Sequence, residues 1–183
     1  MAAKTQNEEG TFQGKSIAEW KEQLNDEKEF ARLSAAVALG ECGPKAVPAL
    51  VEALKHKDPR IRYWAARGLG KIGAEAKSAM PALTEALKDS SESVRVGAAY
   101  TLWKLGKKTD AMTAFIESIK DATAAAQLEV VNDLCLIGPD AREALPAVKK
   151  AAEQKSDDYV YSYVLRKAGT VQKIFEGKPS FGE

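Results

Sequence analysis

Residues 58–73 read Asp-Pro-Arg-Ile-Arg-Tyr-Trp-Ala-Ala-Arg-Gly-Leu-Gly-Lys-Ile-Gly, and this stretch contains the pattern that decides the fold. Asp58 followed by Pro59 is typical of a helix start, because the carboxylate accepts a hydrogen bond from a backbone N–H and proline fits the first helical position. Gly73 fits the position after a helix, where the left-handed conformation ends it. The apolar and small residues between them recur at helical spacing, which predicts an amphipathic helix. They are Ile61, Ala65, Gly68, Leu69 and Ile72.

The same pattern occurs five times along the chain. Each copy ends in a glycine, with a leucine four residues earlier and a small or apolar residue just before the glycine. The glycines are Gly43, Gly73, Gly106, Gly138 and Gly169, and the leucines are Leu39, Leu69, Leu102, Leu134 and Leu165. The glycines are 30, 33, 32 and 31 residues apart, which indicates a repeat protein.

A shorter helix-like segment precedes each of these stretches. Its apolar residues are spaced four apart, as in Leu50 and Leu54, so they face a core. Three copies carry a proline near the start, where one backbone hydrogen bond is lost and we expect a bend. These prolines are Pro48, Pro81 and Pro146, and Thr113 replaces proline in the fourth period. No stretch shows the alternation typical of a strand.

The sequence therefore predicts an all-α protein made of about five helix pairs. One pair cannot bury its apolar face alone, so neighbouring pairs must stack. We expect a flexible N-terminal segment at residues 1–14 and a C-terminal tail at residues 170–183. The predicted pairs are residues 15–43, 44–73, 74–106, 107–138 and 139–169.

The motif of residues 58–73 resembles a HEAT repeat and is most similar to the short HEAT-like repeats of the phycobilisome-lyase type. The resemblance covers about residues 15–169 and implies a right-handed α-solenoid whose second helices line a concave face. Such arrays are typically binding scaffolds, those of the lyase subfamily handle a bilin chromophore, and others are appended to exported hydrolases such as sulfatases. The arginine of the motif is present in the first three pairs and replaced in the last two. The residues there are Arg32, Arg62, Arg95, Gln127 and Asp158.

If the second helices line a concave face, positions ten, nine, six and two residues before each glycine form its surface. Aromatic side chains there offer contact area at little entropy cost, and cations steer a partner. Packing of these rings against the adjacent repeat is the structural alternative. The same rule places Val37, Val96 and Gly97 on this face. The candidate partner-binding residues are Tyr63, Trp64, Arg67, Lys71, Tyr100, Lys104, Asn132, Tyr159, Tyr163 and Lys167.

The chain offers few residues for catalysis or metal binding. Its cysteines are Cys42 and Cys135 and its one histidine is His56, too few for a zinc site of Cys and His ligands. The cysteines fall on core positions three repeats apart, too far for a disulfide. His56 lies in the charged stretch 55–58, which predicts a solvated turn. We therefore expect no catalytic residue, no metal site and no cofactor.

Charge and hydropathy exclude further classes. The chain has 183 residues, 27 Lys+Arg and 26 Asp+Glu, so its net charge is +1. This balance argues against general binding to nucleic acid or to an anionic membrane, and no apolar run approaches the ~18 residues of a membrane span. Met1–Gly10 lacks the apolar region of a secretory signal, so we expect a cytoplasmic location for the chain as written. A periplasmic or exported location stays open if the chain is a mature form or a fragment.

The prediction from sequence is a non-catalytic protein-protein interaction scaffold that binds a protein or peptide on the concave face. Two alternatives stay open. One is a bilin-lyase-type subunit that handles a chromophore, and the other is an accessory HEAT-repeat region of a larger or exported enzyme such as a sulfatase.

Overall fold

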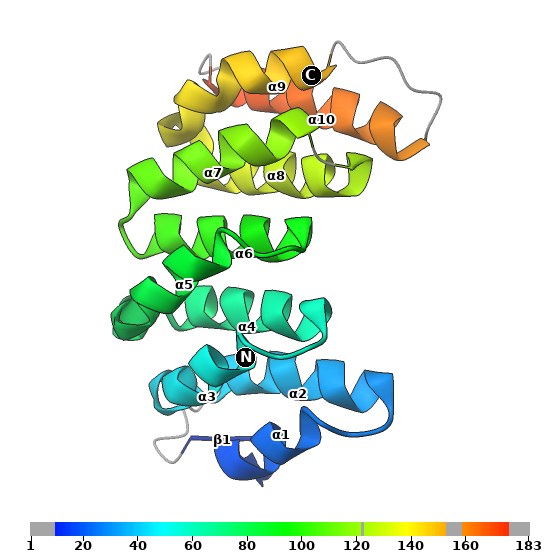
Figure 1. Ribbon diagram of the computed structural model, residues 1–183. Coiled ribbons are helices and arrows are strands. Elements are labelled where there is room, and N and C mark those ends of the chain that lie inside the picture. Colours follow the sequence, from blue (N-terminus) through cyan, green and yellow to red (C-terminus); the bar gives the residue numbers. More distant parts are fainter. Residues whose placement is uncertain (1–9, 122, 153–158, 176–183) are drawn as a thin grey trace, which may run out of the picture. The chain divides into compact units, whose positions relative to one another are not determined.

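The computed structural model describes residues 10–121, 123–152 and 159–175. The chain divides into two compact units, Met1–Lys107 (unit 1) and Lys108–Glu183 (unit 2). Among the described residues the elements form five helix pairs, as predicted, preceded by a short hairpin that was not predicted (Figure 1).

Unit 1 contains the hairpin and three helix pairs. The strands are β1 (Thr11–Phe12) and β2 (Lys15–Ser16). The first helices of the pairs are α1 (Ile17–Gln23), α3 (Val47–Ala53) and α5 (Met80–Ala86). The second helices are α2 (Glu29–Glu41), α4 (Pro59–Ile72) and α6 (Glu92–Lys104). Short 3-10 helices precede α3 and α5, η1 (Pro44–Ala46) and η2 (Gly73–Ala79).

The second helices of unit 1 stack in order, α2 on α4 and α4 on α6, and each contacts the first helix of its own pair (Figure 1). The predicted leucines Leu39, Leu69 and Leu102 are fully buried in the core between the two layers. Helices α2 and α4 approach closely at Gly40, where an added Cβ would lie 2.9 Å from the Cα of Gly68. Small residues at this crossing therefore allow the two helices to pack backbone to backbone.

The predicted prolines lie in the first turn of the α-helices and do not bend them further along. Pro48 is the second residue of α3 and Pro81 the second residue of α5, and a 3-10 helix ends just before each α-helix. Proline lacks an N–H and is tolerated in the first turn of an α-helix. Where Thr113 replaces proline, no 3-10 helix is present and α7 runs without interruption for 14 residues.

The N-terminal segment corrects the expectation of a flexible stretch without strands. Strands β1 and β2 pair antiparallel, Thr11 with Ser16 and Phe12 with Lys15. The indole N–H of Trp20 donates to the carbonyl of Phe12 at 3.1 Å, and Ser16 caps α1 in a capping box with Glu19. The hairpin is thus held by the first helix, while residues 1–9 lie outside the described part.

Unit 2 contains the last two pairs. Its elements are α7 (Lys108–Asp121), α8 (Ala124–Ile137), η3 (Gly138–Ala144), α9 (Leu145–Ala152) and α10 (Tyr159–Phe175). Phe115, Ile119 and Leu134 are buried in its core.

Four of the five predicted helix-ending glycines adopt positive φ, from +74° at Gly138 to +100° at Gly106. Gly169 does not: it lies inside α10, which continues to Phe175. Val171 and Phe175 are buried and extend the apolar side of α10, so the predicted tail begins later than residue 170.

Candidate functional site

The predicted aromatic and cationic residues of α4 and α6 lie together on unit 1. We call Tyr63, Trp64, Arg67, Tyr100 and Lys104 the aromatic strip. The Tyr63 and Trp64 rings meet edge to face, with centroids 5.2 Å apart and planes at 72°. The Arg67 guanidinium lies between the two tyrosines, 4.2 Å from the Tyr100 centroid and 6.0 Å from that of Tyr63. Cation–π contacts of this kind fix the arginine and both rings across neighbouring helices.

Two neighbouring aromatic residues in the strip differ in burial. Tyr63 is half-buried, and a Cβ atom added to Gly97 would lie 3.0 Å from its Cδ2. The missing side chain at Gly97 therefore lets the Tyr63 ring lie against the α6 backbone. Trp64 instead keeps 39% of its surface exposed. Tyr63 is thus part of the helix packing, and Trp64 is available to a partner.

Two lysines, Lys104 of the strip and Lys71 beside it, lie at the C-terminal ends of their helices. Lys71 forms an ion pair with Glu41 of α2. Lys104 donates to the carbonyl of Gly70 at 2.5 Å, and its Nζ lies 5.9 Å from the Tyr100 centroid. Both contacts place positive charge at helix ends that carry partial negative charge.

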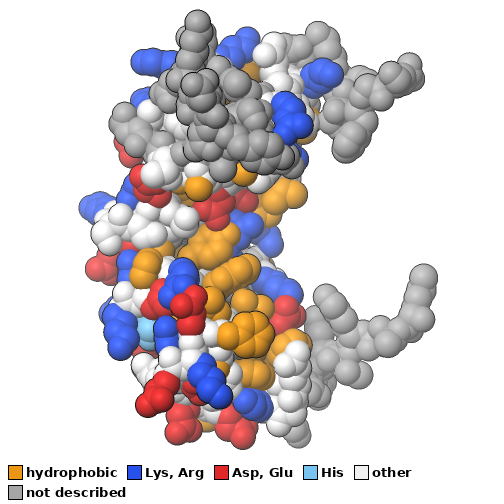
Figure 2. All heavy atoms as spheres, turned by 90° about the vertical axis from the view of Figure 1, so that its right-hand side faces the viewer, with side chains coloured by type: hydrophobic (Ala, Val, Ile, Leu, Met, Phe, Trp, Pro, Cys, Tyr) orange, Lys and Arg blue, Asp and Glu red, His pale blue; other side chains and the backbone are white. Residues whose placement is uncertain are grey.

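Large hydrophobic side chains are exposed on this same face. Among the described residues, three of the four exposed ones belong to unit 1: Phe30 at 83%, Val37 at 40% and Trp64 at 39%. Val37 is seven residues after Phe30 on α2, so both lie on one side of that helix. In Figure 2 hydrophobic side chains gather in the middle of unit 1, in the lower half of the view, between charged side chains. Contiguous exposed apolar surface of this kind marks interaction sites.

The sequence rule for this face is right for some positions and wrong for others. Val37 is exposed as predicted, but Val96 and Gly97 are buried, and at Gly97 the Tyr63 ring lies against the backbone of α6. Phe30 was not among the candidates, since it lies one turn before the first position that the rule counts. The signal for it was its helical phase, seven residues before Val37.

The remaining candidates belong to unit 2. Asn132 is half-buried on α8 and Lys167 is half-buried on α10. Tyr159 and Tyr163 lie in α10, but their side chains are outside the described part of the structure. Leu136, 67% exposed on α8, occupies a position that the same rule counts.

The motif arginines lie near the start of the second helices and bond the turns between paired helices. Arg62 donates through one terminal nitrogen to the carbonyls of His56 and Lys57, and its other nitrogens hold Asp89 at 2.7 and 2.8 Å. Burial alone would raise the pKa of Asp89, but the hydrogen bonds from Arg62 and the Ser91 amide outweigh it and lower that pKa. Arg32 and Arg95 bond the equivalent carbonyls of their own turns. These arginines therefore close the turns.

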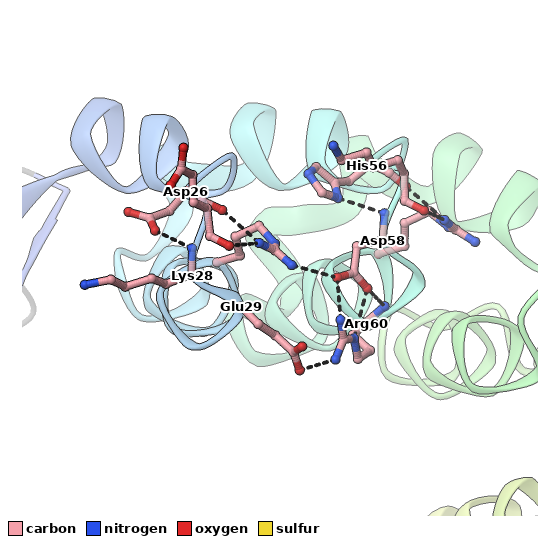
Figure 3. Close-up of polar contacts among 10 residues, drawn as sticks. Asp26, Lys28, Glu29, His56, Asp58 and Arg60 are labelled. Atoms are coloured by element: carbon pink, nitrogen blue, oxygen red, sulfur yellow. Dashed lines mark hydrogen bonds and ion pairs between the residues drawn. The ribbon is translucent and has the colours of Figure 1, made fainter.

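His56 occupies the place of an aspartate in this recurring turn. The amide of Lys28 donates to Asp26 and that of Ser91 to Asp89, and in the middle turn the amide of Asp58 donates to Nδ1 of His56 at 3.0 Å (Figure 3). The prediction of a solvated turn is wrong in one respect, since His56 is half-buried and its Nε2 is buried without a hydrogen-bond partner. Burial lowers the pKa of His56. The contacts give this histidine a structural role.

The described residues offer little else for chemistry. Both cysteines are free thiols, and burial raises the pKa of Cys42 and of Cys135, which disfavours the reactive thiolate. No group of three or more His, Cys, Asp or Glu side chains in the described part is arranged to hold a metal ion. None of the helices described combines the length and apolar character needed to cross a bilayer.

Comparison with known families finds two matching models. The model for HEAT repeats matches residues 17–85, and that for the single HEAT repeat matches residues 79–109. No curated protein matches the chain.

Solved structures share the fold. The complex of CpcE and CpcF of phycocyanin lyase from Nostoc sp. PCC7120 matches with a TM-score of 0.62 and 24% identity, covering 98% of this chain and 71% of that one. An engineered protein matches with a TM-score of 0.49 and 18% identity, over 88% and 80% of the two chains. Human deoxyhypusine hydroxylase matches with a TM-score of 0.39 and 18% identity, over 90% and 74%.

Proposed function

The chain belongs to the HEAT-repeat family, and we propose that it is a non-catalytic scaffold that binds a protein or peptide partner through the aromatic strip. The observation that carries this proposal is the exposure of Trp64 in the strip, together with Phe30 and Val37 of α2 beside it. Tyr and Trp are enriched where binding energy concentrates, and Arg67 adds a fixed cation between two rings.

The repeated turns also support a scaffold role, because the hydrogen bonds of their arginines restrain the helix pairs of unit 1. In each turn an arginine side chain donates to backbone carbonyls, and these hydrogen bonds favour a fixed orientation of α2, α4 and α6. Pre-organised surfaces lose less entropy on binding than flexible ones.

The test is capture from a lysate with the full chain, followed by mass spectrometry. The wild type is compared with a variant carrying Trp64→Ala and Tyr100→Ala. We expect the double variant to lose the captured partner while its far-UV circular dichroism stays helical. Partner capture that survives the double substitution contradicts the proposal, and so does loss of helicity, because the rings would then belong to the core.

A second candidate function is that of a lyase-type subunit that handles a bilin. The match to the phycocyanin lyase complex over 98% of this chain supports it. Mixing the protein with an open-chain tetrapyrrole and following visible absorption through gel filtration separates the two candidates. Absorption that co-elutes with wild type, and not with a heat-denatured sample, favours the second.

A further inference from the structure

We propose that the occupant of this face is a peptide segment of a partner protein in which an apolar anchor is followed closely by acidic residues. This inference rests on the proposed function and adds the chemistry of the partner. It follows from how charge is distributed along α4 and α6.

The apolar part of the face is the anchor site. Phe30 and Val37 expose apolar surface on α2, and Trp64 exposes its indole on α4. An aliphatic or aromatic side chain placed between α2 and α4 covers these groups and gains about 25 cal/mol for each Å² removed from water.

The cations lie beside this anchor site, toward the C-terminal ends of the helices. Arg67, Lys71 and Lys104 carry three positive charges there, and Glu41 carries one negative charge, so this half of the face is net +2. At the N-terminal ends, Arg60 is held by Glu29 and by Asp58, which leaves no positive excess. Carboxylates of a partner are therefore favoured at the C-terminal half and disfavoured at the other.

The spacing along α4 fixes the distance between the anchor and the acid. Trp64 and Lys71 are seven residues apart, or roughly 10 Å along the helix axis. An extended peptide covers that distance in about three residues. The expected motif is an aromatic or aliphatic residue with Asp or Glu within three positions on one side.

The test is selection of a random 12-residue peptide display library on the full chain, followed by sequencing. We expect enriched peptides to place Asp or Glu within three positions of a large apolar residue. The strongest peptide is then synthesised with a fluorophore, together with a version in which Lys replaces each acidic residue.

Four variants locate the site and the charge effect. Trp64→Ala is expected to lower the affinity for the acidic peptide by at least about tenfold. Lys104→Gln is expected to lower it by about threefold and to make it depend less on salt. Gln keeps an N–H donor for the Gly70 carbonyl while removing the charge. The controls Thr84→Ala and Lys88→Gln, exposed positions at the first-helix side, are expected to change affinity less than twofold.

The outcomes separate the two levels of the proposal. The acidic motif is overturned if the enriched peptides lack acidic residues, or if the Lys-substituted peptide binds with equal affinity. The proposed binding face stands in that case if Trp64→Ala still abolishes binding. No enrichment over an unrelated control protein, or binding that is unchanged by Trp64→Ala, overturns both.

Discussion

Arg62 and Arg67 lie five residues apart on α4, and they show the contrast between the turns and the open face of unit 1. Arg62 is saturated by two turn carbonyls and by the carboxylate of Asp89 in the next repeat. Arg67 instead stacks between Tyr63 and Tyr100 beside exposed apolar side chains. The turns thus hold the repeats together, and the open face is where substitutions should affect binding before they affect folding.

The largest expected effect is in the turns. Arg62→Ala removes four hydrogen bonds and leaves the half-buried Asp89 without its cation, so we expect the free energy of unfolding to fall by ~3 kcal/mol. Urea unfolding followed by circular dichroism measures it. Arg60→Ala is the matched control, because Arg60 is exposed and its ion pairs with Glu29 and Asp58 contribute at most ~1 kcal/mol. An equal loss of unfolding free energy in the two variants would contradict the role of Arg62 in holding the turn.

The next effect distinguishes two neighbours on the open face. Tyr63→Ala empties the space over Gly97, and we expect a loss of ~2 kcal/mol, less than for a fully buried ring. Trp64→Ala removes a more exposed ring and is expected to cost under ~1 kcal/mol. The same urea measurement compares them. A larger loss for Trp64→Ala than for Tyr63→Ala would place the indole in the packing and not at the surface.

A smaller effect of opposite sign is expected from restoring the aspartate of the turn. His56→Asp provides a carboxylate in the position of Asp26 and Asp89, close to Arg32, whose guanidinium lies 3.9 Å from the Asp58 carboxylate. It also removes the buried Nε2 that lacks a partner. We expect stabilisation by about 1 kcal/mol in urea unfolding at pH 7. His56→Ala, which lacks an acceptor for the Asp58 amide, should destabilise.

The smallest effect is the pH dependence of the same turn. Burial holds the pKa of His56 below its ordinary value of 6.5, so the unfolded chain takes up the proton more readily than the folded one. The contribution of neutral His56 to stability is therefore complete above pH 6.5 and is lost as pH falls through 6.5 toward the folded pKa. We expect the free energy of unfolding to decrease from pH 7 to pH 5.5 in the wild type and to change less in His56→Asn. His56 is the one histidine of the chain, so an equal decrease in both would assign the effect to other groups.

The repeat could be predicted from the sequence because it depends on local rules. The first four leucines and the first four glycines follow from helical spacing and from the left-handed helix end, and the structure confirms them. The prediction that a helix ends at Gly169 was wrong, because the helix continues where later residues can still be buried. In α10 the apolar stripe continues through Val171 to Phe175, and the helix continues with it.

The features that were missed depend on contacts between distant residues. Gly97 is buried by the ring of Tyr63 from another helix, and no pattern within α6 indicates that. The role of His56 became clear only from its hydrogen bond to the Asp58 amide, although alignment of the turns at Asp26, His56 and Asp89 contained the signal. The hairpin at the N-terminus depends on the indole N–H of Trp20, which donates a hydrogen bond to the carbonyl of Phe12.

The most direct test of the account measures stability and binding side by side in two variants. We predict that Arg62→Ala lowers the urea midpoint and retains partner capture at a temperature where it is folded. We predict that the Trp64→Ala and Tyr100→Ala double variant loses capture, while its midpoint falls less than that of Arg62→Ala. The reverse pattern, capture kept by the double variant and lost by folded Arg62→Ala, would contradict the division between turns that hold the fold and a face that binds.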